Sequence, residues 1–260
     1  MSNVLSNIPV VILCGGKGSR LLEETSLTPK PLINLDKFSL LFHIMKIYLK
    51  SGFKNFIILT GYKHLNFVKY FKNKLPRLLN EKIIISKENG ITFLYKNFSI
   101  KIINTGNNTL TGARILKVKE LLKKKDYFAV TYGDGLSNVN IKKTFIKLKK
   151  SKNHGIMSVV NPIERFGKVK IKNNLVTKFN EKKIDQNKWI NIGFFIFKNN
   201  FFQYLDNKSM LENKPLKKVT QKRKLMVHKH NGFYHCIDFL NEKKIAQNLI
   251  KKFKIPPWLR

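Results

Sequence analysis

The sequence predicts an α/β protein with a mixed, mainly parallel sheet flanked by helices and a small antiparallel extension. Up to about residue 160, short β-branched runs alternate with longer segments of helical periodicity, which is typical of parallel strands joined by helices. Beyond that point the alternating run KVKIK at 168–172 indicates a half-exposed antiparallel strand. Hydrophobic residues make up 43% of the 260, enough for a core.

Each predicted element follows from its own local pattern. In 38–51 the apolar residues Leu41, Ile44, Met45 and Tyr48 recur at helical spacing, and Gly52 supplies a stop. Further helices are expected over 110–124, 141–151, 209–222 and 239–252. Strands are expected at 9–14, 55–60, 82–86, 99–103, 127–131, 155–160, 168–172, 189–197, 225–229 and 232–237. The basic, proline-bearing segment 251–260 is expected to be a loosely ordered tail.

The charge composition is strongly basic, with 51 Lys and Arg against 15 Asp and Glu and a formal net charge of +36. Such an excess is typical of polyanion binders. However, only six of these residues are Arg, the residue that phosphate and base recognition favours, and the lysines are dispersed. We therefore favour a lysine-rich, solvated surface and expect no specific nucleic acid and no membrane partner.

The two cysteines and the N-terminal segment indicate the cellular compartment in which the protein is expected. Cys14 and Cys236 cannot form a disulfide framework, which favours a reducing, cytoplasmic location. The apolar run 8–14 has no basic start and no small-residue cleavage site, so it indicates a buried strand and not a secretion signal. No apolar stretch is long enough to span a membrane.

A glycine-rich turn follows the first expected strand directly. Glycine lets backbone N–H groups approach a phosphate or base closely, and Arg20 and Lys30 add positive charge. The turn lacks the GKS/T ending of a P-loop and the GxGxxG spacing of a dinucleotide-binding fold. By itself it is a weak indicator of a nucleotide site. The candidate residues are Leu13, Gly15, Gly16, Gly18, Arg20 and Lys30.

Two of the scarce acidic residues directly follow expected strands. Asp134 lies in Tyr132-Gly133-Asp134-Gly135 after the strand 127–131, and Asp238 follows 232–237. Open α/β sheets bind ligands at the carboxyl ends of their strands. Mg²⁺ is usually held by one or two carboxylates together with substrate phosphates, so these two residues are candidate ligands if they meet across the fold.

Taken together, GGxGxR, PKP ten residues later and GDG resemble the sugar-phosphate nucleotidyltransferases. The stretches 103–106 and Leu110-Thr111-Gly112-Ala113-Arg114 resemble the glucose-1-phosphate cytidylyltransferase branch. The resemblance implies a Rossmann-like fold of the nucleotide-diphospho-sugar transferase type in a single domain, 9–250. It implies a nucleotide-binding half (9–150), a sugar-phosphate half (151–250), and short segments 1–8 and 251–260 outside them.

The resemblance also implies roles for individual residues. Arg20 and Lys30 would stabilise the triphosphate, and Asp134 and Asp238 would bind Mg²⁺. In the second half, Gly167, Glu181, Lys182 and Asn191 would bind the sugar phosphate. The nucleotide would lie against Leu13, Gly15, Gly16, Gly18, Thr111, Gly112 and Tyr132, although Thr111 could instead be a helix N-cap.

The implied reaction is Mg²⁺-dependent transfer from CTP to a sugar-1-phosphate, and the family implies a homo-oligomer. Ile192 and Phe239 depart from the family pattern, which leaves glucose specificity open. The alternatives are a different NTP, sugar phosphate or polyol phosphate, a non-catalytic nucleotide-sugar-binding homologue, and an RNA-binding protein.

The histidines and Cys14 are two further candidates for a functional role. His228, His230 and His235 cluster in the sequence, but without acids or cysteines at ligand spacing we favour surface or packing roles over a metal site. Cys14 beside the glycine-rich loop could be sensitive to alkylation.

Overall fold

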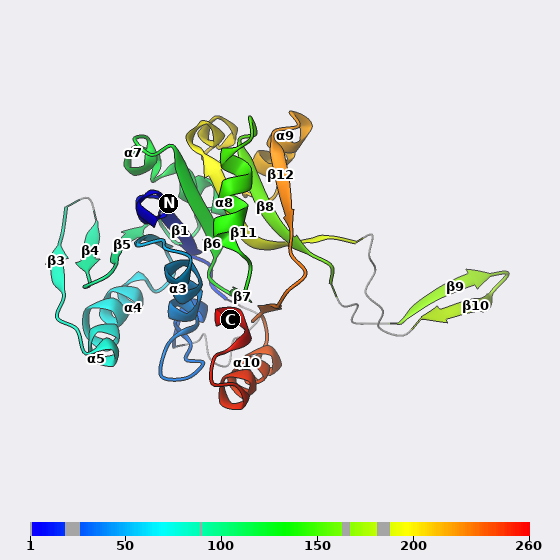
Figure 1. Cartoon of the computed structure of the whole chain (residues 1–260), viewed down its shortest axis with the longest axis horizontal. Coiled ribbons are helices and arrows are strands. Elements are labelled where there is room, and N and C mark those ends of the chain that lie inside the picture. Colours follow the sequence, from blue (N-terminus) through cyan, green and yellow to red (C-terminus); the bar gives the residue numbers. More distant parts are fainter. Residues whose placement is uncertain (1, 19–26, 89, 163–166, 181–187) are drawn as a thin grey trace.

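A computed structural model describes residues 2–18, 27–88, 90–162, 167–180 and 188–260 of the chain. Its centre is a nine-stranded sheet in the order β12-β8-β11-β6-β1-β2-β5-β4-β3, with helices on both faces (Figure 1). The pairs β1–β2, β1–β6, β2–β5 and β12–β8 are parallel, and β11–β6, β11–β8, β3–β4 and β4–β5 are antiparallel. The predicted mixed, mainly parallel α/β sheet is confirmed.

The strands lie close to the predicted runs. They are β1 Pro9–Cys14, β2 Asn55–Thr60, β3 Ile84–Ser86, β4 Ile91–Leu94, β5 Ser99–Asn104, β6 Tyr127–Tyr132, β7 Gly135–Ser137, β8 Gly155–Val160, β9 Lys168–Lys172, β10 Leu175–Asn180, β11 Ile190–Lys198, β12 Leu225–Lys229 and β13 Tyr234–Cys236. The α-helices are α1 Ser2–Ser6, α3 Leu40–Lys50, α4 His64–Lys69, α5 Leu75–Leu79, α6 Thr111–Leu116, α7 Lys119–Leu122, α8 Ile141–Lys149, α9 Lys214–Gln221 and α10 Leu240–Lys252. The short helices are the 3-10 helices η2 Lys30–Leu32, η4 Asn199–Tyr204 and η5 Pro257–Leu259 and the π-helix η3 Tyr70–Lys74.

The core strand and its neighbouring helix form for local reasons. Every residue of β1 is buried, as a central strand covered on both faces requires. Helix α3 begins after Ser39, whose hydroxyl accepts a hydrogen bond from the Phe42 N–H, and ends before Gly52, whose φ of 95° favours glycine. Along α3 the predicted apolar face packs into the core.

The sheet brings the segments of the site to one edge. Parallel pairing of β1 and β6 places Leu13 opposite Tyr132, so the glycine-rich turn and Asp134 leave the sheet side by side. A small antiparallel pair of β7 and β13 sets Cys236 opposite Gly135. The Ile237 N–H then donates to the Asp134 carbonyl at 3.0 Å. This backbone contact brings Asp238, distant in sequence, beside Asp134.

Several predicted elements are shorter or differently paired. The strand expected at 82–86 is the outermost strand β3, antiparallel to β4, which was not predicted. The single helix expected over 110–124 is two, α6 and α7, because the backbone of Val118 (φ −106°, ψ 15°) leaves the helical region. The helix expected over 209–222 begins only at Lys214, followed by Pro215, which suits the first turn of a helix.

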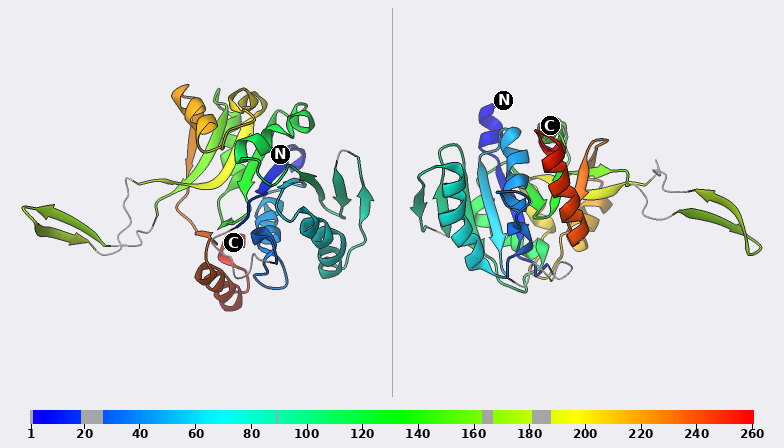
Figure 2. Two further views of the ribbon diagram at one scale, coloured as in Figure 1. Left: turned by 180° about the vertical axis from the view of Figure 1, so that it is seen from behind. Right: turned by 90° about the horizontal axis from the view of Figure 1, so that it is seen from below.

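The antiparallel extension is a hairpin arm made of β9 and β10. It projects from the body in every view (Figures 1 and 2). Cross-strand pairing places Val169 opposite Phe179 and Ile171 opposite Val176, so these four side chains share one face. The exposed fractions of these residues run from 48% for Val169 to 66% for Ile171. The arm therefore carries an apolar face that no described residue covers.

The C-terminal segment 251–260 is not loosely ordered, so that expectation was wrong. Trp258 is only 1% exposed, and its indole N–H donates to His43 Nδ1 at 3.3 Å. The other nitrogen of His43 lies 3.0 Å from Asp36 Oδ1, and burial lowers the pKa of His43. A neutral imidazole that accepts from Trp258 and donates to Asp36 satisfies both contacts. An apolar anchor with a buried hydrogen bond holds the segment in place.

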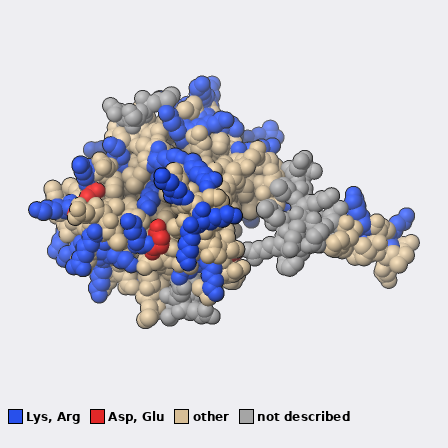
Figure 3. Space-filling view, turned by 60° about the horizontal axis from the view of Figure 1, so that its bottom comes forward, with Lys and Arg blue, Asp and Glu red and all other residues tan. Residues whose placement is uncertain are grey.

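Among the described residues, no helix is both long and apolar enough to cross a membrane. Positive side chains are spread over the face shown in Figure 3, where acidic ones are few and isolated. This distribution agrees with a lysine-rich, solvated surface.

We expect Trp258→Ala to lower the free energy of unfolding by about 3–5 kcal/mol, because it empties a fully buried aromatic site and removes a hydrogen bond. Chemical denaturation followed by circular dichroism measures this change. Trp189→Ala is the matched control, because Trp189 is only half-buried, and it should cost far less. Equal losses in the two variants would contradict the anchoring role of the tail.

Candidate functional site

An open pocket of about 400 Å³ lies where β1 and β6 end. Five segments line it: the turn after β1, the loop 107–110, the start of α6, the end of β6 with the two residues after it, and Met210. Of the residues predicted to bind nucleotide, Leu13, Gly15, Gly16, Thr111 and Tyr132 line this pocket, together with Asp134. The structure thus gathers most of the predicted nucleotide-binding residues around one concavity.

Lys30 joins the two predicted metal ligands. Its ammonium donates to Asp134 Oδ2 at 2.9 Å and to Asp238 Oδ1 at 2.6 Å. Burial acts to lower the pKa of Lys30, but the two carboxylates outweigh it and raise that pKa. Lys30 therefore stays charged, and the two carboxylates are close enough to share one cation.

The position of Lys30 depends on glycine at 133. Lys30 and Pro31 belong to the turn η2, which packs against the end of β6. A Cβ on Gly133 would lie 2.9 Å from Pro31 Cγ and 3.1 Å from Cys14 Sγ. Any larger residue at 133 would push η2, and with it Lys30, away from Asp134. The predicted GDG element therefore has a packing reason for its first glycine.

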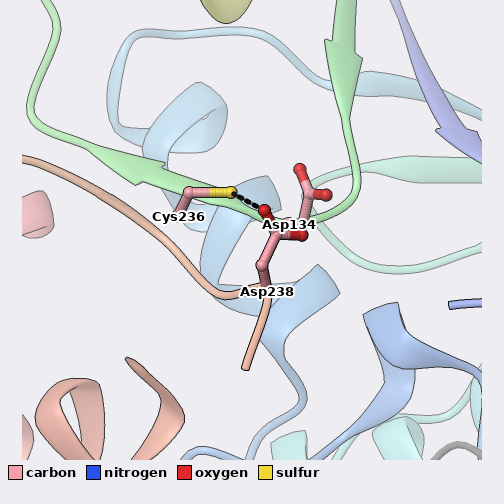
Figure 4. A group of neighbouring side chains, drawn as sticks. All are labelled: Asp134, Cys236 and Asp238. Carbon is pink, nitrogen blue, oxygen red and sulfur yellow. Dashed lines mark hydrogen bonds between the residues drawn. The ribbon is translucent and has the colours of Figure 1, made fainter. Parts of the chain in front are cut away.

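Cys236 is a third group at the carboxylate pair, and it was not predicted. Figure 4 shows its thiol directed at Asp238, with Sγ to Oδ2 at 3.8 Å. Potential ligand atoms of Asp134, Cys236 and Asp238 all lie within 4.8 Å of one another. Burial and the charges of Asp134 and Asp238 raise the pKa of the Cys236 thiol to about 12. In the sequence, this cysteine is two residues from the candidate ligand Asp238.

A second, larger pocket of about 1030 Å³ opens on the other side of Asp238. Its walls include Trp189, Tyr234, His235, Cys236 and Asp238. Because Asp134 lines the first pocket and Asp238 the second, the Lys30 ion pairs stand at the junction of the two. Such an arrangement can place two ligands on either side of one charged centre.

The buried Arg114 side chain holds the glycine-rich turn in place through hydrogen bonds. The side chain is 3% exposed and donates to the carbonyls of Gly15, Thr60, Gly106 and Asn107, as well as to the Thr105 hydroxyl. A Cβ on Gly15 would lie 2.0 Å from the guanidinium carbon, so only glycine fits there. Arg114 thus ties the turn to the loop 105–107 on the opposite wall of the pocket.

Glu212 fixes the two predicted nucleotide-binding hydroxyls. Its Oε2 accepts from the Thr111 hydroxyl at 3.0 Å, and its Oε1 accepts from the Tyr132 hydroxyl. Thr111 Oγ1 also accepts from the Leu211 N–H at 2.8 Å. The predicted alternative of Thr111 as an N-cap was wrong, because Leu110 holds that position. Nothing in the local sequence around Glu212 indicates this role, which depends on a tertiary contact.

Other predicted site residues lie elsewhere. Gly112 is buried in α6 against the Ser209 carbonyl, and Gly18 has a φ of 66°, which favours glycine. Asn191 contacts Tyr132 and accepts from the Gly193 N–H, and Gly167 stands before the arm. None of these four lines either pocket. Arg20, Glu181 and Lys182 lie outside the described residues, so all of these assignments stay predictions.

Two expectations about reactive groups can be assessed. Cys14 is buried, and burial raises the pKa of its thiol above the usual range, so little of the reactive thiolate forms. The expected sensitivity of Cys14 to alkylation is therefore wrong. His230 and His235 each bond a backbone carbonyl, of Phe233 and Glu242 respectively. The one group of three potential metal ligands found among the described residues does not include these histidines.

Comparison with known proteins assigns the chain to a family. Residues 9–239 match the family model described as "Nucleotidyl transferase". The chain belongs to the nucleotidyl transferase family. It is 34% identical over 250 residues to glucose-1-phosphate cytidylyltransferase from Salmonella typhimurium, covering 95% of this chain and 97% of that one.

More distant similarities also cover most of the chain. D-glycero-alpha-D-manno-heptose 1-phosphate guanylyltransferase from Campylobacter jejuni is 28% identical over 193 residues, covering 74% of this chain and 76% of that one. The crystal structure of HddC from Yersinia pseudotuberculosis superposes with a TM-score of 0.68 at 20% identity, covering 93% of this chain and 98% of that chain. The resemblance inferred from the motifs is confirmed, and so is the fold type.

We expect Glu212→Gln to weaken nucleoside triphosphate binding. An amide offers one acceptor oxygen to the two hydroxyls of Thr111 and Tyr132, and an unsatisfied buried group costs about 1–3 kcal/mol, or roughly tenfold to hundredfold in Kd. Isothermal titration calorimetry with each of the four nucleoside triphosphates measures this. Glu120→Gln, at an exposed helix position, is the control and should bind as the wild type does. An unchanged Kd in Glu212→Gln would contradict the positioning role.

Proposed function

We propose that this nucleotidyltransferase transfers a cytidylyl group from CTP to a sugar-1-phosphate, with glucose-1-phosphate as the favoured acceptor. The observation that carries the proposal is the Lys30–Asp134–Asp238 centre at the junction of two pockets, one lined by the predicted nucleotide-binding residues. The name of the Salmonella typhimurium relative supports the choice of nucleotide and sugar. The products would be a CDP-sugar and pyrophosphate.

The carboxylate pair suits Mg²⁺, as the family resemblance implies. Asp134 and Asp238 already share one cation, the Lys30 ammonium, through oxygen atoms. Carboxylates are the protein ligands that Mg²⁺ takes, with waters and substrate phosphates in the remaining positions. When bound there, Mg²⁺ would neutralise charge on the phosphates of both substrates. Asp134 and Asp238 are the residues that would hold it.

The protein's part in the reaction is positioning and charge neutralisation. An oxygen of the sugar phosphate attacks the α-phosphorus of CTP, a new P–O bond forms, and the bond to pyrophosphate breaks. The attacking phosphate is ionised near neutral pH, so no general base is required. Lys30, released from one carboxylate, would donate to the phosphates, and the backbone of Gly15 and Gly16 would border the nucleotide.

A different NTP or sugar phosphate is the second candidate for substrate. The relative from Campylobacter jejuni carries guanylyl transfer to a heptose phosphate in its name, at 28% identity. In this chain the pocket beside Asp238 has a volume of about 1030 Å³, which accommodates more than a hexose phosphate. Pyrophosphate release with each NTP against a panel of sugar and polyol phosphates decides between the candidates.

We expect Asp134→Asn to lower kcat by at least about a hundredfold, because it removes a charge that the proposed metal and Lys30 both contact. Pyrophosphate release in Mg²⁺ measures the loss, and circular dichroism follows the fold. Asp126→Asn is a matched control, since Asp126 is exposed directly before the same strand β6. Full activity in Asp134→Asn, or no turnover of any substrate pair by the wild type, would refute the proposal.

We also propose that the chain forms a homo-oligomer through the arm. The apolar face of Val169, Ile171, Val176 and Phe179 supports this, because a two-stranded hairpin is marginally stable alone in water and gains by covering such a face. The lysines Lys170 and Lys178 face the opposite side, where a second copy would not bury them.

Replacing Ile171 and Phe179 together by Lys should therefore lower the mass in solution to that of a monomer, as measured by light scattering during gel filtration. The control is the double replacement of the exposed Lys170 and Lys178 by Gln, which leaves the apolar face intact. A monomeric wild type, or a variant that keeps its oligomeric mass, would contradict assembly through the arm.

A further inference from the structure

The proposed metal centre includes a sulfur atom that a Mg²⁺ site does not use. Asp134, Cys236 and Asp238 form the one group of three potential ligands found within the described ranges of the chain. Mg²⁺ is a hard cation that takes oxygen ligands, whereas thiol sulfur selects Zn²⁺, Cd²⁺ and other soft cations. The donor set of two carboxylates and one thiol therefore fits a second class of cation.

The spacing of the three groups is close to that of a tetrahedral site. Bond lengths for Zn–S and Zn–O imply a separation of about 3.6 Å between a sulfur and an oxygen ligand. Cys236 Sγ lies 3.8 Å from Asp238 Oδ2. With all three ligand atoms within 4.8 Å of one another, Asp134 completes the set by a side-chain adjustment of about one ångström.

The two oxygens of Asp238 face different partners. Oδ1 accepts from the Lys30 ammonium at 2.6 Å, and Oδ2 accepts from the Cys236 thiol. A cation seated between Sγ and Oδ2 would thus lie on the side of Asp238 away from Lys30. Because the second pocket is lined by both Cys236 and Asp238, solvent reaches this side, which gives a cation an entry path.

The backbone holds Cys236 and Asp238 in this arrangement. Cys236 pairs with Gly135 across β13 and β7, and the Ile237 N–H donates to the Asp134 carbonyl. The Glu242 carboxylate accepts from the N–H groups of Asp238 and Phe239, at 2.6 and 3.0 Å. The three ligands are therefore supported by main-chain contacts, as a metal site requires of its surroundings.

We propose that Asp134, Asp238 and Cys236 bind a thiophilic divalent cation, of the class of Zn²⁺ and Cd²⁺, beside the proposed Mg²⁺ position and through the same two carboxylates. The inference deepens the proposed function: the soft cation competes with Mg²⁺ and inhibits nucleotidyl transfer. As the metal–sulfur bond forms, the thiol proton passes to water. Three protein ligands leave a fourth tetrahedral position for water or a phosphate oxygen.

Cd²⁺ is the probe, because its bond to a thiolate gives an ultraviolet charge-transfer band. The metal-free full-length protein is titrated with Cd²⁺, with no nucleotide or sugar phosphate present. We expect a band that saturates at one equivalent and that weakens when Mg²⁺ is added in large excess. Cys236→Ser and Cys236→Ala should lose the band, and Asp238→Asn should weaken Cd²⁺ binding by about tenfold or more.

Cys14→Ala is the matched control, because it removes the other cysteine, which is 2% exposed in the core. This variant should keep the band. Absence of the band in the wild type, or its persistence in folded Cys236→Ser, would overturn the inference. Should Cys236→Ser fail to fold, the second variant, Cys236→Ala, serves in its place.

The test is independent of turnover. A missing band together with loss of activity in Asp134→Asn would refute the soft-cation site and leave the proposed function standing. A band together with no turnover of any substrate pair would refute the proposed function and leave the soft-cation site standing. With both intact, Cd²⁺ should inhibit Mg²⁺-supported pyrophosphate release, and excess Mg²⁺ should relieve the inhibition.

Discussion

The ion pairs of Lys30 with Asp134 and Asp238 are the interaction on which the site depends. They join a turn near the N-terminus to the end of a central strand and to a segment near the C-terminus, at 2.9 and 2.6 Å. Two carboxylates at this spacing would repel each other without a cation between them. A substrate phosphate or a metal ion can compete for these contacts, so the same interaction that orders the site also allows its partners to be exchanged.

Around this centre, the buried Arg114 and the half-buried Glu212 hold the walls of the pocket in place. Arg114 donates to carbonyls of the glycine-rich turn and of the loop 105–107, and the Glu212 carboxylate accepts from the hydroxyls of Thr111 and Tyr132. Buried charges are stabilised only when hydrogen bonds satisfy them. Because these hydrogen bonds offset the free-energy cost of burying the two charges, the walls that would border the nucleotide are held in place without a ligand.

The excess of positive charge has a modest role in this picture. Lysines are spread over the surface in Figure 3, while the charge that organises the site comes from one lysine and two acids. A dispersed net charge of +36 attracts anionic substrates in a general way, which aids encounter more than it defines specificity. Specificity is left to the pockets on either side of Asp134 and Asp238.

The sequence by itself determined most strands of the sheet, the glycine-rich turn, and Lys30, Asp134 and Asp238 as candidate site residues, because periodicity, turn residues and motif spacing are local properties. It did not give Cys236, Glu212 or the bracing role of Arg114, nor the anchoring of Trp258. Each of these depends on a partner far away in the chain: Cys236 pairs with Gly135, Glu212 accepts from Tyr132, Arg114 donates to Gly15, and Trp258 donates to His43. Only tertiary structure decided them, because contact between remote segments follows from packing and register, which no local pattern encodes.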